Sequence, residues 1–364
     1  MNTSVILPAK KPADRQIISN GMLEANYPRN MWWMAAWTHE ITDKPTARTL
    51  LDRAIVLYRG ASGSAVALDD RCPHRSAPLS EGRVCGDALA CPYHGLKFGP
   101  DGTCIEVPTQ KDIPKTLRVA SYPLMERKDI IWIWLGDKSA IEQTPHPPDE
   151  LAPDSTWTTI RGYFRLDFNY VLLRENVIDL THLPFVHSAT FGQTDWIKVP
   201  EVEFTDTSVR YKAEFPNSNL TPVFGGPMGI LPGKRVDRFQ VGEMITPAVS
   251  YSRWIIKDRS PEPGERSDFE MRAMHIATPI SPNETHYFWS ASYDMLGISN
   301  ELLEESRSSI TFAFQEDAIL LAKLHKNVKN DPRGLDYPEV NLGADKAGIH
   351  VRRILQRYLQ QESQ

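Results

Sequence analysis

Short apolar runs separated by turn residues fill the chain between Met31 and Leu135. Breaks such as Arg59-Gly60 and Gly99-Pro100-Asp101-Gly102 separate these runs, and that spacing is typical of a small all-β domain. The strands that the pattern predicts are Met31–Trp37, Ala54–Tyr58, Ala65–Leu68, Leu89–Pro92, Leu117–Tyr122 and Ile130–Leu135. The polar residues 1–26 that precede them predict a loosely ordered arm.

The pattern changes after residues 144–153, where closely spaced prolines predict an extended linker. Apolar residues then recur at helical spacing, which predicts helices over Asn169–His182, Asn300–Asn327 and Val351–Leu359. The strands expected among them are Glu201–Phe204, Val209–Phe215, Ser250–Ile256, Met271–Thr278 and Tyr287–Tyr293. We therefore expect an α+β protein, with an all-β domain over residues 27–143 and a domain of sheet and helices over residues 154–364.

Composition and charge narrow the range of functions. The chain has 364 residues, and 41 Lys and Arg against 46 Asp and Glu give a net charge of −5. This balance offers no electrostatic footprint for nucleic acid or anionic lipid. The sequence has neither the roughly 20 apolar residues that span a bilayer nor the apolar run of a secretory signal, which predicts a cytoplasmic protein. All four cysteines lie between Cys72 and Cys104, and in a large cytoplasmic chain this favours a metal over disulfides.

The first group of candidate ligands consists of Cys72, His74, Cys91 and His94. Each of two short segments supplies one thiolate and one imidazole, as Cys-x-His and then Cys-x-x-His. Two metals held side by side can each take like ligands from such loops, and this is the Rieske [2Fe–2S] arrangement. A zinc site with two cysteines and two histidines is the alternative, although zinc motifs usually pair like residues in each loop. Cys85 and Cys104 have no histidine at ligand spacing and are expected to be buried residues or free thiols.

A second group of candidate ligands lies between Asn176 and His187. Asp179 and His182 are three residues apart, so on a helix they share a face, and Asn176 lies one turn earlier on it. Pro184 is expected to end or bend that helix and so to bring His187 back beside His182. Two neutral imidazoles and one carboxylate on one side of an iron form the facial triad of non-haem Fe(II) oxygenases.

The carboxylate of this triad is either Asp179 or a residue distant in sequence. Asp317 is the stronger candidate, because it lies in register with the apolar stripe of the long helix and is expected to point inward. That stripe consists of Leu303, Ile310, Phe314, Leu321 and Leu324. A buried carboxylate without a cation is costly, and a bound metal offsets that cost. The neighbouring Glu316 lies about 100° around the helix and is expected to face solvent.

Together the two groups resemble a known family. The chain carries Cys-Pro-His, then Cys-Pro-Tyr-His-Gly, and about 80 residues later Glu-Asn-x-x-Asp-x-x-His-x4-His. This order, over residues 27–330, resembles the oxygenase components of Rieske non-haem iron oxygenases. The stretches Asp-Arg-Cys-Pro-His-Arg-Ser-Ala-Pro-Leu-Ser and Ile-Ile-Trp-Ile-Trp-Leu-Gly-Asp are most similar to the vanillate O-demethylase and dicamba monooxygenase branch. The resemblance implies a Rieske β-domain followed by a helix-grip catalytic domain, assembled head to tail as a homotrimer.

The resemblance also implies a role for each candidate residue. Cys72 and Cys91 would bind one iron of a [2Fe–2S] cluster, and His74 and His94 the other. His182, His187 and Asp317 would bind a mononuclear Fe(II). Asp179, with Asn176 beside it, would be the catalytic acid that bridges His182 to the His94 of a neighbouring subunit and so carries electrons to the iron.

The implied activity is O2-dependent monooxygenation of a small aromatic compound, with oxidative O- or N-dealkylation as the expected reaction. An arene cis-dihydroxylating dioxygenase with the same metal centres is the alternative. A pure electron carrier or zinc-stabilised binding module is the alternative from another class, and it leaves the second ligand group unexplained. No Gly-x-Gly-x-x-Gly follows a predicted strand, so electrons from NAD(P)H are expected to arrive through a separate reductase, with or without a ferredoxin.

The sequence says less about the substrate. His275 alternates with Ala273 and Ala277, so one strand face combines small residues with a polar group, as a ligand pocket requires. A histidine whose hydrogen bonds are satisfied within the sheet is the alternative. Residues 205–270 match nothing in the resemblance and are expected to determine which substrate is bound.

Overall fold

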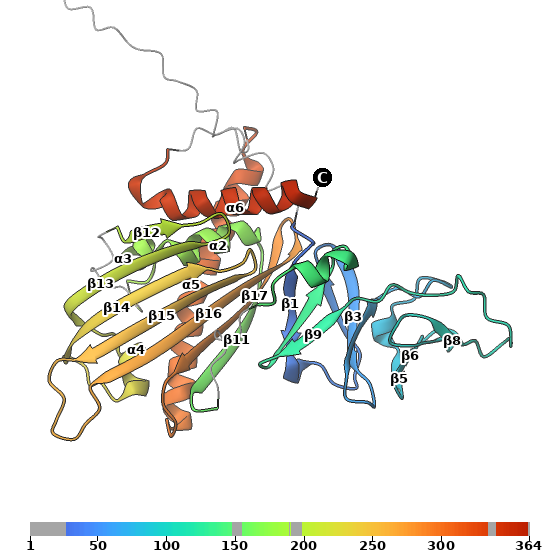
Figure 1. The fold of residues 1–364 in the computed structure, drawn as a ribbon, viewed down its shortest axis with the longest axis horizontal. Coiled ribbons are helices and arrows are strands. Elements are labelled where there is room, and N and C mark those ends of the chain that lie inside the picture. The colour runs from blue at the N-terminus through green and yellow to red at the C-terminus, as the bar shows by residue number, and fades with distance from the viewer. Residues whose placement is uncertain (1–26, 148–154, 189, 191–198, 334–339, 363–364) are drawn as a thin grey trace, which may run out of the picture.

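The computed structural model describes residues 27–147, 155–188, 190, 199–333 and 340–362 (Figure 1). The predicted N-terminal arm and residues 148–153 of the predicted linker lie outside these ranges. Within them, no helix combines the length and the apolar character needed to cross a membrane.

The first part of the chain folds into three small antiparallel sheets, as the short apolar runs predict. The first sheet contains β1 (Trp32–Trp37), β10 (Ile130–Trp134) and β9 (Leu124–Arg127). The second contains β2 (Thr46–Leu50), β3 (Arg53–Arg59) and β4 (Ala65–Asp69). The third contains β5 (Arg83–Cys85), β6 (Ala88–Ala90), β7 (Lys97–Phe98) and β8 (Cys104–Glu106). This last sheet lies at one end of the molecule, remote from the large sheet (Figure 1).

The strand predicted over Leu117–Tyr122 is wrong. The segment forms only isolated bridges, because its N–H groups bond to two different sheets in turn. Val119 donates to the carbonyl of Gly102 beside the third sheet, whereas Tyr122 donates to the carbonyl of Ala67 in the second. A segment that crosses between two sheets cannot continue a ladder with either.

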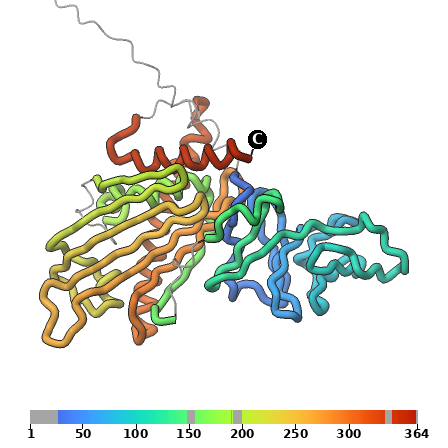
Figure 2. The backbone as a smooth tube through the Cα atoms, in the orientation of Figure 1, coloured from blue at the N-terminus to red at the C-terminus, as the bar shows by residue number. Residues whose placement is uncertain are grey.

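The second part of the chain is built on one antiparallel sheet of seven strands. Their order is β11-β17-β16-β15-β14-β13-β12. The bounds are β11 (Thr158–Leu166), β12 (Glu201–Phe204), β13 (Val209–Asn219), β14 (Arg235–Met244), β15 (Val249–Asp258), β16 (Asp268–Ser281) and β17 (Glu284–Tyr293). With the helices described next, this sheet confirms the predicted α+β fold (Figure 2).

The helices are α2 (Tyr170–Ile178), α3 (Leu183–Val186), α4 (Pro222–Gly225), α5 (Asn300–Asn330) and α6 (Lys346–Glu362). The long helix α5 runs along one face of the sheet, and α6 crosses its upper end over α2 and β13 (Figure 1). The buried face of α5 consists of Ser306, Ile310, Ala313, Asp317, Leu321 and His325. Asp317 therefore points inward as predicted, but Leu324 does not belong to the stripe, since it is 40% exposed.

The helix predicted over Asn169–His182 breaks at Asp179. Helix α2 ends at Ile178, and Asp179 is extended, with φ −110° and ψ 103°. Its carboxylate accepts a hydrogen bond from Thr181 N and begins a short 3-10 turn, Leu180–His182. Asp179 and His182 therefore do not share the face of one helix, and the chain turns before Pro184 rather than at it. Pro184 lies in the first turn of α3, where its missing N–H costs nothing.

The two parts of the chain share one hydrophobic core. That core joins β1 and β10 to the large sheet, and Thr278 in β16 donates from its hydroxyl to the carbonyl of Met34 in β1 at 2.8 Å. A second, smaller core surrounds Cys72 and Cys91 and includes Tyr58, Leu68 and Phe98. The loops that carry these cysteines are thus supported by a core of their own.

Candidate metal centres and substrate cavity

Two loops of matching geometry present the four candidate cluster ligands. The first closes with a hydrogen bond from Cys72 N–H to the carbonyl of Ala77 at 2.8 Å, and the second repeats it from Cys91 N–H to Leu96 at 2.8 Å. In both loops, the residue four places after the cysteine donates its N–H to the cysteine carbonyl and has a positive φ. In the second loop this residue is Gly95, with φ 73°, a conformation that glycine adopts without strain.

The thiols and the imidazoles of these loops face different surroundings. Cys72 and Cys91 are buried side by side, and burial, together with the Cys91 thiol, raises the pKa of Cys72. His74 and His94 are exposed, and their ring centroids lie 4.6 Å apart. The donor set thus has both sulfurs inside and both imidazoles at the surface, which fits a [2Fe–2S] cluster with two cysteines on one iron and two histidines on the other.

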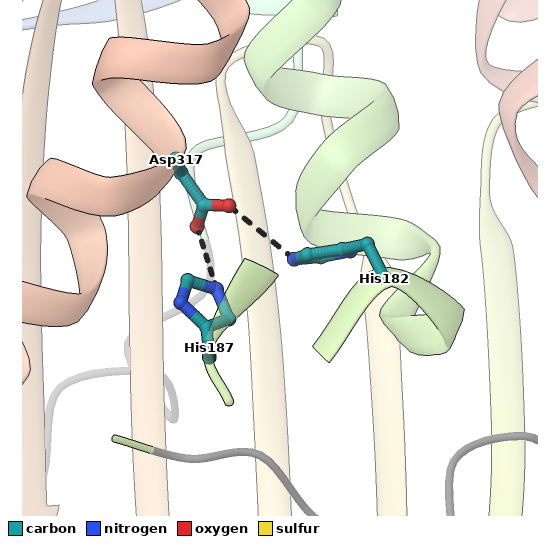
Figure 3. A group of neighbouring side chains, drawn as sticks. All are labelled: His182, His187 and Asp317. Carbon is teal, nitrogen blue, oxygen red and sulfur yellow. Dashed lines mark ion pairs between the residues drawn. The ribbon is translucent and has the colours of Figure 1, made fainter. Parts of the chain in front are cut away.

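His182, His187 and Asp317 converge on one point below α5. Their candidate ligand atoms all lie within 4.8 Å of one another. Asp317 Oδ1 is 3.4 Å from His182 Nε2, and Asp317 Oδ2 is 3.2 Å from His187 Nε2. Figure 3 shows the carboxylate between the two rings, with Asp317 on one helix and the histidines on the segment opposite. Two imidazoles and one carboxylate on one side of a small space fit the predicted facial triad.

Each histidine of the triad donates its other ring nitrogen to a fixed acceptor. His182 Nδ1 donates to the main-chain carbonyl of Asp179 at 2.6 Å, and His187 Nδ1 donates to Glu316 Oε2 at 3.0 Å. These bonds orient both rings with Nε2 toward Asp317, as metal-binding histidines require. Burial lowers the pKa of His182. For His187, burial is outweighed by hydrogen bonds to Asp317 and Glu316, which raise its pKa.

Two expectations about acidic residues near the triad are wrong. Glu316 does not face solvent: its Oε2 accepts from both His187 and the Thr190 hydroxyl, the latter at 2.8 Å. Asp179 does not contact His182 through its carboxylate, as its expected role requires. The His182 ring donates to the main-chain carbonyl of Asp179, and the carboxylate of Asp179 accepts from the N–H and hydroxyl of Thr181. The break in the helix at Asp179 explains why the carbonyl replaces the carboxylate as the partner of His182, because the break turns the main-chain carbonyl toward the imidazole.

Asn176 adds a further polar contact at the triad. Its Nδ2 donates to Asp317 Oδ1 at 3.1 Å and lies 3.4 Å from His182 Nε2. Asn176 is the last polar side chain of α2, and His182 lies in the 3-10 turn that follows that helix. The two residues therefore reach the same side of the triad from two different elements, not from one common helix as predicted.

Two adjoining cavities lie between the sheet and α5. A cavity of about 60 Å³, the metal pocket, is lined by the three triad residues and Asn176. A cavity of about 90 Å³, the main cavity, lies farther along the sheet. The residues that line both are Val177, Leu180, Leu183, His275 and Phe314. A molecule in the main cavity would therefore reach the triad through an apolar neck.

Comparison with known proteins extends over nearly the whole chain. Residues 31–123 match the Rieske [2Fe-2S] domain, and residues 166–361 match the vanillate O-demethylase oxygenase C-terminal domain. The iron-sulfur subunit of the toluene-4-sulfonate monooxygenase system of Comamonas testosteroni is 33% identical, over 92% of this chain and 98% of that protein. The dicamba O-demethylase oxygenase component of Stenotrophomonas maltophilia is 32% identical, over 93% of this chain and 99% of its own. A crystal structure of dicamba monooxygenase bound to 3,6-dichlorosalicylic acid has a TM-score of 0.83 at 29% identity, over 93% and 99% of the two chains.

These matches decide the family. The chain belongs to the Rieske non-haem iron oxygenases. The predicted resemblance to the vanillate O-demethylase and dicamba monooxygenase branch is confirmed. The prediction of an oxidoreductase with a [2Fe–2S] cluster and a non-haem iron is also confirmed. A related dicamba monooxygenase structure contains the non-haem iron. One of these relatives is named as an oxygenase component and another as the iron-sulfur subunit of a monooxygenase system. The family also favours monooxygenation over cis-dihydroxylation.

Several polar groups of the Rieske oxygenase face the main cavity. Burial lowers the pKa of His275 to about 3, so the ring is neutral, and its Nδ1 lies 2.7 Å from the hydroxyl of Tyr287. Among the described residues, buried atoms without a hydrogen-bond partner include Gln240 Oε1, Trp254 Nε1 and Trp289 Nε1, all on side chains that line this cavity. Sequence reasoning missed these three, because only the pairing of the strands brings them together.

Proposed function

We propose that this Rieske oxygenase removes an alkyl group from a small aromatic ether or amine. The observation that carries the proposal is the apolar neck between the triad and the main cavity, where His275 and Phe314 line both spaces. One relative is named as a demethylase and another as a monooxygenase, which supports dealkylation through oxygen insertion into a C–H bond. Insertion into an O-methyl group gives a hemiacetal that collapses to formaldehyde and a phenol. The second oxygen atom leaves as water after two electrons and two protons are supplied.

We assign the ligands as the sequence and the geometry indicate. Cys72 and Cys91 hold one iron of the cluster, and His74 and His94 hold the other. His182, His187 and Asp317 hold the mononuclear iron. When bound, these groups supply electron storage and O2 activation. The chain supplies the rest, because the carbonyl of Asp179 and the carboxylate of Glu316 fix the two rings, and Asn176 fixes one oxygen of Asp317.

Electrons reach the triad from another copy of the chain in this proposal. The sheet beside the cluster loops lies at one end of the molecule, away from α2 and α3 (Figure 1). His74, His94 and the neighbouring Tyr93 are exposed at that end, with Tyr93 65% exposed. A head-to-tail homotrimer would place this tip against Asp179 of the next subunit. The electron donor is a reductase that oxidises NAD(P)H, with or without a ferredoxin, and dependence on that donor favours a cytoplasmic location.

Reconstitution with a surrogate reductase tests the proposal. Aryl methyl ethers are screened for substrate-dependent O2 uptake and for formaldehyde, with Asp317→Ala as the matched variant that keeps the cluster. The proposal expects formaldehyde from at least one ether with the wild-type protein and none with the variant. A cis-dihydrodiol as the sole product would instead establish the dihydroxylating alternative.

A chain-mixing experiment tests the inter-subunit route separately. Cys72→Ser, which lacks the cluster, and Asp317→Ala, which lacks the iron site, are each expected to be inactive. Mixed and reassembled, they are expected to recover activity, because a cluster from one chain can then serve a triad in the other. Mixed assemblies that stay inactive would contradict the route.

A further inference from the structure

Strand pairing arranges the side chains of the main cavity in three rows across the sheet. The metal-side row holds Ser250, His275 and Trp289, the middle row holds Gly242, Ser252, Ala273 and Ala291, and the far row holds Gln240, Trp254 and Met271. His275 also lines the metal pocket, so the rows run from the triad outward. Four residues along a strand separate His275 from the far row, which corresponds to about 13 Å. The cavity is thus an elongated slot with the triad at one end.

The middle row leaves room for a flat ring. Ser252, Ala273 and Ala291 are small and leave this room, whereas the ring of Tyr211 covers Gly242. A Cβ on Gly242 would come within 2.1 Å of the Tyr211 ring, so only glycine permits this arrangement. An aromatic ring placed here would have one end near His275 and the opposite end at the far row.

The far row carries one unpaired donor and one unpaired acceptor side by side. Gln240 and Trp254 are direct cross-strand partners on the cavity face. Gln240 is 1% exposed and Trp254 is 8% exposed, and neither Gln240 Oε1 nor Trp254 Nε1 has a partner among the described residues. Buried polar atoms are nearly always paired, so a pair left open at a cavity wall indicates a ligand group that accepts from the indole and donates to the amide.

The charge around the slot disfavours an anion at this end. Among the described residues that line the main cavity, Glu243 is the only charged side chain. The buried cation Arg174 lies behind the metal-side row, where it donates to Ser250 Oγ at 2.6 Å and to the carbonyl of His275 at 3.3 Å. Arg238 follows Gln240 on the same strand face, but its guanidinium lies over the Phe215 ring and donates from Nε to Ser218 Oγ at 2.9 Å, and it does not line the cavity. A carboxylate or sulfonate at the far row would therefore find no cation among the described residues that line the cavity, and its oxygens cannot donate to Gln240 Oε1.

We propose that the substrate is a neutral arene whose reacting alkyl group lies opposite a hydroxyl or carboxamide, which binds Gln240 and Trp254. This assignment rests on the proposed function for the position of the reacting group. A hydroxyl or a primary carboxamide both donates and accepts, so either matches the open pair. The elongated slot requires a 1,4-arrangement of the two substituents, since they must reach opposite rows.

Binding to the resting, metal-loaded enzyme tests this without turnover. Dissociation constants are measured by calorimetry for 4-methoxybenzamide, 4-methoxybenzoate and 4-methoxytoluene. We expect the amide to bind at least about tenfold more tightly than the benzoate, because one matched hydrogen-bonding pair is enough for a factor of that size. Trp254→Phe and Gln240→Met are each expected to weaken amide binding about tenfold and to leave binding of the toluene unchanged.

A matched control distinguishes the loss of an indole N–H at the cavity from the loss of one elsewhere in the protein. Trp32 also has a buried, unpaired Nε1, but it lies in the core near β10 rather than at the cavity, so Trp32→Phe should leave all three constants unchanged. Tighter binding of the benzoate, or amide binding that is the same in Trp254→Phe and Gln240→Met as in wild type, would overturn the assignment. No binding of the amide would also overturn it.

Formaldehyde release, measured separately, distinguishes this inference from the proposed function. Selective binding of the amide without formaldehyde release would support the assignment of Gln240 and Trp254 as the binding pair and would contradict dealkylation of this probe. Formaldehyde from the benzoate, at a rate insensitive to both variants, would support dealkylation and overturn the neutral-substrate assignment.

Discussion

Replacing Glu316 by alanine removes the acceptor that orients His187, a proposed ligand of the mononuclear iron. Glu316 Oε2 accepts from His187 Nδ1 at 3.0 Å and from Thr190 Oγ1 at 2.8 Å, and His187 is 1% exposed. Glu316→Ala removes the acceptor of a buried N–H, and losing such a partner costs about 1–3 kcal/mol. Loss of such an outer partner typically weakens metal affinity by about 10–100-fold. Glu316→Gln keeps an acceptor but loses the charge, so its metal affinity should lie between those of wild type and Glu316→Ala.

The assay is an equilibrium titration of the mononuclear site. Protein with an intact cluster is stripped of the third iron and titrated with Fe(II) against a competing chelator, and iron is counted by elemental analysis. Glu305→Ala, an exposed position on the same helix, is the control and should leave the affinity unchanged. An iron affinity in Glu316→Ala equal to that of wild type would refute the reasoning that the Glu316–His187 bond supports the site.

Four further outcomes follow from the structure. Asp317→Ala should abolish product formation while the visible spectrum and the reduction of the cluster stay unchanged; full activity with iron retained would contradict its assignment as a ligand. His74→Cys should lower the cluster potential in a redox titration, because a thiolate donates more charge than an imidazole; an intact cluster with an unchanged potential would contradict ligation by His74. Gly242→Ala should raise KM for aromatic substrates, because the new Cβ displaces the ring of Tyr211 into the slot; an unchanged KM would show that the ring has another place to go. Burial lowers the pKa of His286 to about 4, so its neutral form is favoured in the folded state. As pH drops from about 6.5 toward 4, His286 alone should therefore contribute a fall in the unfolding free energy of about 1.4 kcal/mol per pH unit. Denaturant melts of His286→Gln should show a shallower dependence, and an equal slope would assign the effect to other groups.

Elements with strong periodicity could be predicted from the sequence, and those with mixed faces could not. The 31 residues of α5 were expected to within three residues, since apolar positions recur along one side. Strand β14 was missed because its buried face alternates Val236, Arg238, Gln240 and Gly242, so polar residues occupy the positions at which burial normally selects apolar ones. The break at Asp179 was missed because the apolar spacing continues through it, whereas the local bond to Thr181 N decides the backbone there.

The sequence reveals the proposed metal ligands more readily than it reveals the residues around them. Cysteine and histidine at fixed spacings indicate a metal site on their own, and Asp317 follows from its place on a helix face. Glu316 could not be found in this way, because a position 100° around a helix predicts solvent unless another segment covers it, and the segment of His187 does. The slot residues Gln240 and Trp254 are brought together only by strand register, which depends on the whole sheet.

In the proposed reaction, the two metal centres of this chain together carry out a monooxygenation that removes an alkyl group. A single turnover under ¹⁸O2 tests it most directly: the cluster is reduced chemically, an aryl methyl ether that binds is added, and labelled O2 is admitted. We expect one formaldehyde for each O2 consumed and a phenol that keeps its original, unlabelled oxygen, because the bond broken is the one between that oxygen and the methyl carbon. A ring product carrying two labelled oxygens, or no product from protein that holds both metals and the ether, would contradict it.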